Sequence, residues 1–293
     1  MRSLAVVLLF PLAAPAQTAE IQDSVDQALA TIRYVQALQT KEGGFRPSAK
    51  APAASLRGTS AALRALRYFG GKARDEAAAR EFVLSCLDAK TGGFADTPGG
   101  KADVILTAVG LMAMVELKLP TETVQKRAVA FMAGNAKEFE QVRMAAAGLE
   151  TIGKPSPRRD EWLAKLGKMR NEDGTFGKGK GQARETGGAV ACLLRLGGAV
   201  ADRDAVLKAL DAGQRTDGGF GTATADGSDL ETSYRVMRSY HMLKAQPKRA
   251  DDLRRFVARC RNADGGYGVT PGTESTVGGT YFASIILHWL GRK

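Results

Sequence analysis

The sequence predicts an all-α fold in which six helical-hairpin repeats close into a double ring of twelve helices. A glycine turn followed by an aromatic residue recurs along the chain, at Gly43-Gly44-Phe45, Gly92-Gly93-Phe94, Gly174-Thr175-Phe176, Gly218-Gly219-Phe220 and Gly265-Gly266-Tyr267. The turns are evenly spaced except between the second and third, whose interval is close to twice the others, so a weakened copy is expected near Gly134. Apolar residues recur at helical spacing around the turns, and strand-type alternation is absent.

The apolar pattern places one helix before and one after each turn. Before the first turn, Ile21, Val25 and Leu29 are four residues apart; after it, Leu56, Leu63 and Leu66 mark the returning helix. The same test along the chain predicts helices over 21–39, 55–69, 74–87, 103–117, 121–133, 139–152, 158–169, 185–196, 202–213, 230–243, 248–260 and 277–290.

The turn glycines have a conformational reason. The first is expected to take the left-handed conformation that ends a helix, and the second lets the chain reverse closely against its neighbour. The aromatic residue then covers the helix end.

Ring closure is favoured over an open solenoid, because neither end of the chain shows the polar outer face of a capping repeat. The second helix of each pair is expected to line the inside. These helices are rich in small residues, as in Gly58-Thr59-Ser60-Ala61-Ala62 and Gly187-Gly188-Ala189, which let crowded helices approach closely.

The first residues resemble a secretory leader, with Arg2, an apolar run from Leu4 to Leu12 and small residues up to Ala16. We therefore expect a signal peptide at 1–16, an exported protein (periplasmic or extracellular) and a single toroid domain over 17–293. No membrane-spanning segment is expected.

The net charge of +11 would attract anions, but nucleic acid is not an expected partner after export. Three separated cysteines, Cys86, Cys192 and Cys260, indicate buried apolar positions rather than disulfides.

The turns, the period and the sixfold count resemble those of the prenyltransferase and squalene-cyclase repeat family, whose members fold as an α6/α6 toroid. The stretch from Gln214 to Phe220 is most similar to protein prenyltransferase (geranylgeranyltransferase type II) β subunits. The resemblance implies a transferase that moves a prenyl group, and an isoprenoid or other lipid-like ligand.

Protein prenyltransferases hold a catalytic zinc with an Asp, a Cys and a His, and the resemblance implies where these ligands would stand in this chain. Asp229 stands at the Asp position, but Glu231 stands at that of the Cys and Gly279 at that of the His. The family's zinc site is therefore not expected, and the cofactor is left open. Asp229 and Glu231 become the candidate catalytic residues. Thr186 replaces a family His that grips the diphosphate, whereas Arg143 and Cys192 match family residues.

The cyclases of the family use an Asp-x-Asp-Asp motif and aromatic walls that steady a cation. This sequence has only Asp229-Leu230-Glu231. Aromatic residues on the expected inner helices are few beyond Tyr234, Tyr240, Tyr281, Phe282 and Trp289.

An anion site is predicted at one end of the barrel. If the inner helices run parallel, their six N-termini converge there with partial positive charges. The basic residues near these helix starts are Arg57, Arg143, Lys178, Lys180 and Arg184. The alternative interpretation is a solvated loop with scattered surface charges.

These observations support three hypotheses about function. The first is an exported toroid that binds a lipid-like or anionic ligand in a central cavity, with prenyl transfer as the implied reaction. The second is a non-catalytic interaction or scaffold domain with a protein partner. The third is a carbohydrate-active toroid, because other α6/α6 barrels cleave acidic glycans. A deep apolar tunnel that reaches Asp229 would favour the first function, and a plugged barrel would favour the second.

Overall fold

The computed structural model describes residues 15–291, with side chains from residue 24 onward. In this range the chain forms twelve α-helices, one short 3-10 helix (η1, Gly179–Gly181) and no β-strand. The outer helices are α1 (Pro15–Ala37), α3 (Glu76–Ser85), α5 (Glu122–Asn135), α7 (Arg159–Met169), α9 (Arg203–Ala212) and α11 (Ala250–Arg259). The inner helices are α2 (Leu56–Phe69), α4 (Val104–Glu116), α6 (Phe139–Thr151), α8 (Gln182–Arg195), α10 (Leu230–Met242) and α12 (Val277–Trp289).

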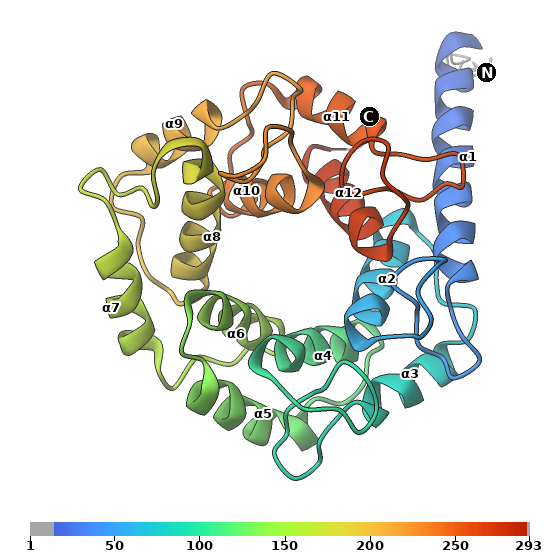
Figure 1. Cartoon of the computed structure of the whole chain (residues 1–293), viewed down its shortest axis with the longest axis horizontal. Helices are drawn as coiled ribbons and strands as arrows, with labels where there is room; N and C mark the ends of the chain where they lie inside the picture. Colours follow the sequence, from blue (N-terminus) through green and yellow to red (C-terminus); the bar gives the residue numbers. More distant parts are fainter. Residues whose placement is uncertain (1–14, 292–293) are drawn as a thin grey trace, which may run out of the picture.

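The helices form a closed double ring (Figure 1). Each inner helix packs against the next, and α12 packs against α2, so the inner ring has no open edge. The predicted toroid of six hairpins is therefore confirmed. Among the helices of the described residues, none combines the length and apolar character that a membrane span requires.

The inner helices run parallel, as ion pairs between neighbours show. Near their starts, Arg184 of α8 lies beside Glu231 of α10 at 3.5 Å. At their ends, Arg195 of α8 pairs with Glu150 of α6 at 2.7 Å. Starts therefore meet starts and ends meet ends, and the helix N-termini gather at one rim of the barrel.

The turn glycines take the predicted left-handed conformation, for example φ of 88° at Gly43 and 87° at Gly265. The expectation that they end the helix is wrong. Helix α1 ends at Ala37, and Gly43 lies further on, in a turn that the N–H of Thr40 closes by donating to the carbonyl of Gly44. The second glycine allows close approach as predicted, because a Cβ on Gly44 would lie 2.7 Å from the Phe82 ring of the next hairpin.

The third repeat keeps its hairpin without a glycine turn. Helix α5 continues through Gly134, and Ala136 to Glu138 lead directly into α6. The side chains of Glu138 and Gln141 form a capping box at the start of α6. A degenerate repeat is therefore present near Gly134, but a short capped connection joins its two helices in place of a glycine turn.

The three cysteines are free and buried, as predicted. Burial raises the pKa of Cys192 to about 12, so its thiol stays protonated. The predicted signal peptide at 1–16 lies, except for its last two residues, outside the described residues. Export therefore stays a prediction.

Candidate functional site

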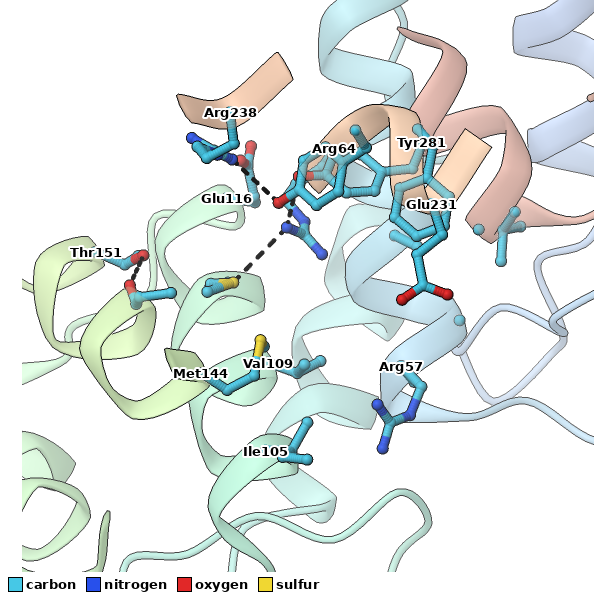
Figure 2. A pocket seen from close by; sticks show the side chains of 18 of the residues that line it. Arg57, Arg64, Ile105, Val109, Glu116, Met144, Thr151, Glu231, Arg238 and Tyr281 are labelled. Atoms are coloured by element: carbon cyan, nitrogen blue, oxygen red, sulfur yellow. Dashed lines mark hydrogen bonds between the residues drawn. The ribbon is translucent and has the colours of Figure 1, made fainter. Parts of the chain in front are cut away.

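A central cavity of about 780 Å³ occupies the middle of the ring. All six inner helices contribute to its lining. Its apolar wall comes from α4 and α6, where Ile105, Val109, Met112 and Met144 line it. In Figure 2, Ile105, Val109 and Met144 lie below Arg64, Arg238 and Tyr281. The barrel is therefore open rather than plugged.

The polar wall is built on an arginine-tyrosine cluster, which comprises Arg64, Tyr234, Arg238 and Tyr281. Arg64 Nη1 donates to Tyr281 Oη at 2.9 Å, and Arg238 Nη2 donates to Tyr234 Oη at 3.2 Å. Neither guanidinium pairs with a carboxylate of the described residues, and the buried Nε of Arg238 has no hydrogen-bond partner. The cluster therefore carries a surplus of positive charge.

Aromatic faces hold these guanidinium groups in place. Arg64 Cζ lies 4.1 Å from the ring centre of Tyr281, and Arg238 Cζ lies 4.5 Å from that of Trp289. Both distances fall in the range of cation–π attraction. Phe282 stacks on Tyr234, which also lies against Tyr281 and Trp289, so four of the five aromatic residues singled out from the sequence gather on one wall. The fifth, Tyr240, is buried elsewhere and donates to Asp211.

The cluster changes the acidity of its tyrosines. Burial opposes ionisation of Tyr234, but the charges of Arg238, Arg195 and Arg64 outweigh it and lower the pKa of that phenol to about 6. Burial and the neighbouring Tyr234 raise the pKa of Tyr281. The cluster can therefore hold one phenolate, on Tyr234.

The two candidate catalytic residues lie differently. Asp229 is the N-cap of α10, and its carboxylate accepts hydrogen bonds from the N–H and the hydroxyl of Thr232 at 2.7 and 2.8 Å. Glu231 lines the central cavity and pairs with Arg235 at 2.8 Å. Asp229 lines neither cavity, so the central cavity is open but is not the tunnel reaching Asp229 that prenyl transfer predicts. A catalytic role of either residue stays a prediction.

The five predicted anion-binding residues do not form one site. Arg57 and Arg143 line the central cavity. Lys178 and Arg184 line a second cavity of about 700 Å³ at the rim, here called the rim cavity. Lys180 lines neither and pairs with the exposed Asp226 at 3.3 Å. Helix starts do converge as predicted, but the ion pair between Glu140 of α6 and Arg235 of α10 lies between the two groups of basic residues.

The arginine-tyrosine cluster was not predicted as a site. Its signal in the sequence is weak: Tyr234 and Arg238 are four residues apart on one helix face, and Arg64 lies within a run of small and apolar residues, from Ser60 to Leu66, on an inner helix. A charged residue among small residues on an inner helix could have indicated the cluster, because a buried charge must face a partner or a cavity.

The residues at the zinc positions of the resemblance do not fit a cation. Two arginines already engage Glu231, and Asp229 caps its helix. At Gly279 a Cβ would lie 2.5 Å from the carbonyl oxygen of Tyr267, so no ligand side chain fits there. Across the part of the chain that the structure describes, no group of three or more His, Cys, Asp or Glu side chains is placed to hold a metal ion.

Comparison with known proteins gives a family match and several structural matches. The model of the prenyltransferase alpha-alpha toroid domain matches residues 3–77, 71–133 and 130–293. No curated protein matches the sequence.

Solved structures with a similar fold come from different functional classes. A wild-type glycosidase has 14% identity and a TM-score of 0.65, with 94% of this chain and 98% of that chain covered. A variant of the type II terpene cyclase MstE from Scytonema, in complex with its substrate geranylgeranyl dihydroxybenzoate, has 10% identity and a TM-score of 0.62, with 93% and 98% covered. A protein from Actinoplanes has 14% identity and a TM-score of 0.60, with 91% and 98% covered. At such identities the likeness concerns the fold.

Proposed function

The chain belongs to the prenyltransferase alpha-alpha toroid family, and from this membership we propose that its central cavity binds an amphipathic anion with a prenyl-type hydrocarbon chain. The cavity volume of about 780 Å³ is within the range of pockets that bury whole small ligands. The observation that carries the proposal is the pair of guanidinium groups, Arg64 and Arg238, that bind tyrosine hydroxyls and have no carboxylate partner within the described part of the chain.

The acidic end of the ligand is assigned to these two arginines. A phenolate on Tyr234 would balance one of the two charges and leave the other without a counter-ion. A diphosphate or carboxylate would supply that charge through charge-assisted hydrogen bonds, which are stronger than neutral ones. Binding of an anion beside Tyr234 would also disfavour its phenolate, so the ligand should bind with uptake of a proton.

The hydrocarbon part of the ligand is assigned to the wall of Ile105, Val109, Met112 and Met144. Burial of such a chain stabilises the complex by about 25 cal/mol per Å² of apolar surface, before the cost of association. A carbocation is a less suitable occupant, because Arg64 and Arg238 already lie over the faces of Tyr281 and Trp289. The ligand-bound terpene cyclase supports a lipid-like ligand only as a protein of the same fold.

Calorimetric titration with geranylgeranyl diphosphate and with the uncharged geranylgeraniol tests the proposal. We expect the diphosphate to bind at least tenfold more tightly than the alcohol. Replacing either guanidinium, in Arg64→Gln or Arg238→Gln, should weaken diphosphate binding by about 10-fold or more, since hydrogen bonds to charged groups contribute about 1.5–3 kcal/mol.

The control is Lys248→Gln, which removes a charge from an outer position whose side chain is 80% exposed. It should bind like the parent. Equal affinity for the diphosphate and the alcohol, or unchanged affinity in both arginine variants, would contradict the proposal and leave the scaffold function as the better description.

A carbohydrate-active toroid is the second candidate, and one observation favours it. The lowered pKa of Tyr234 makes its phenolate available as a base in a cavity with several ion pairs. Glycosidases with a similar fold are compatible with this reading. In the same titration series, binding of polygalacturonate oligomers in preference to geranylgeranyl diphosphate would favour this candidate.

A further inference from the structure

The rim cavity lies beside the central one, at the end where the inner helices begin. It is formed by the first turns of α6 and α8, by Arg235 of α10 and by two loops, one around Asn171 to Gly181 and one at Thr222 to Thr224. Glu140 and Arg235 line both cavities and form the wall between them. The rim cavity therefore adjoins the central cavity, and apart from these two residues its lining is its own.

A chain of ion pairs crosses this wall and leaves one arginine poorly paired. Each member pairs with the next in this order: Arg143, Glu140, Arg235, Glu231 and Arg184. The links between the first four are 2.7 to 2.8 Å long, and the last, from Glu231 to Arg184, is 3.5 Å. Three arginines share two carboxylates, and the surplus positive charge lies at Arg184.

The surroundings of Arg184 indicate a missing acceptor. Its Nη1 is buried and has no hydrogen-bond partner. Burial and the neighbouring Arg235 lower the pKa of Arg184, because both disfavour its charged form. Arginine nevertheless stays charged at any physiological pH, so the unmet charge and the unmet N–H persist.

The remaining lining defines which anions fit. Lys178 lies at the cavity with no ion pair among the described residues, and its ammonium adds positive charge. Glu185 adds a carboxylate, which lies against Gly177 and can accept a hydrogen bond from a ligand. The hydroxyls of Thr222 and Thr224 lie 3.4 Å apart on a facing loop. This set suits a ligand that has both an anionic group and hydroxyl groups.

We propose that the rim cavity is a second binding site, specific for a small hydroxylated anion with a carboxylate or phosphate group that pairs with Arg184. The planar guanidinium offers two parallel donors, which match either group. Lys178 attracts the anion at the mouth, and Glu185 accepts from its hydroxyl. This site does not depend on the lipid-like ligand of the central cavity.

The test is calorimetric titration of the purified protein with glycerol 3-phosphate, glycerate and uncharged glycerol. We expect at least one of the two anions to bind and glycerol not to bind. Arg184→Gln should weaken anion binding by about tenfold or more. Arg184→Lys keeps the charge but loses the two parallel donors of the guanidinium, so it should weaken binding by less. Lys178→Gln should have a smaller, salt-sensitive effect.

Lys180→Gln is the matched control, because it removes the same charge from the same loop at a residue outside both cavities. It should bind like the parent, and thermal midpoints show whether each variant is folded. Absence of binding of both anions up to about 10 mM, unchanged binding in folded Arg184→Gln, or an equal loss in Lys180→Gln would overturn the proposal. Arg64→Gln should leave rim binding intact, which separates this result from that for the central cavity.

Discussion

At the scale of single residues, four arginines of the central cavity show two ways of holding a guanidinium group. Arg67 and Arg195 each pair with a glutamate, whereas Arg64 and Arg238 bind tyrosine hydroxyls and aromatic faces. A buried charge without a counter-ion is costly, so it must be stabilised by hydrogen bonds, by π faces or by a neighbour that ionises. The lowered pKa of Tyr234 is one expression of that requirement.

Ionisation of Tyr234 is the residue-scale prediction. Absorbance at 295 nm, followed against pH, should show one tyrosine that ionises well below the rest, and Tyr234→Phe should abolish that step. In Arg238→Gln the step should move to higher pH, because the cationic neighbour that lowers the pKa of Tyr234 most is gone.

The lowered pKa of Tyr234 also predicts how the free energy of unfolding depends on pH. The pKa of Tyr234 is lower in the folded protein than in an unfolded chain, so its phenolate stabilises the fold at high pH. This contribution is lost as the pH falls from about 10 to about 6. The stability difference between the parent and Tyr234→Phe should therefore grow with pH across this window. A difference that is constant with pH would argue against the phenolate.

At the scale of elements, a hydroxyl side chain joins each glycine-aromatic turn to its inner helix. In five hairpins a buried Thr or Ser accepts a hydrogen bond from the N–H of the turn's aromatic residue, at 2.9 to 3.1 Å. The acceptors are Thr59, Thr107, Thr186, Ser233 and Thr280. Thr186 has this structural contact at the place where the family resemblance expects a His.

Replacement of Thr107 tests this link. Thr107→Val keeps the side-chain shape but leaves the buried N–H of Phe94 without an acceptor, so we expect a loss of about 1–3 kcal/mol in the free energy of unfolding. Thr107→Ser keeps the hydroxyl and loses one methyl group, which costs about 1 kcal/mol. Urea unfolding gives both values. If Thr107→Val were as stable as Thr107→Ser, the hydrogen bond would not hold the turn.

At the scale of the whole molecule, the last repeat closes the ring on the first. The carbonyl of Gly265 accepts a hydrogen bond from Thr31 Oγ1 of α1 at 2.7 Å. The N–H of Val277 donates to the carbonyl of Pro47 at 2.9 Å. The turn glycine thus makes the same contact with the following outer helix that Gly43 makes with α3, and closure repeats the ordinary contact between hairpins.

Gly265→Ala should open this junction. A Cβ at Gly265 would lie 2.6 Å from the carbonyl oxygen of Ala30, whereas Gly272 has a similar positive φ of 79° and nothing within 4 Å. Both alanine variants share the left-handed strain of about 1–2 kcal/mol, so their difference isolates the clash. We expect Gly265→Ala to be less stable than Gly272→Ala by about 1–3 kcal/mol, with faster amide exchange in α1. Equal stabilities would mean that the junction adapts without cost.

The sequence predicted the elements better than the site. Helix α10 was expected over 230–243 and spans 230–242, because apolar spacing and capping residues are local. The turn near Gly134 was misjudged, since spacing shows that a repeat is present but not how its hairpin is connected. Arg64 and Tyr281 are 217 positions apart, and no local pattern indicates that they meet.

The ring of helical hairpins follows from the sequence alone, because its requirements are local and repeated: positive φ at the first turn glycine, a small residue at the second position, and an apolar face on each helix. The chemistry inside the ring depends on contacts that form only when the chain is folded. Charges from helices far apart in the chain meet across the barrel, and the pairs that form determine which arginines have no carboxylate partner among the described residues, or only a distant one. By this selection Arg64 and Arg238 are left for the central cavity and Arg184 for the rim cavity.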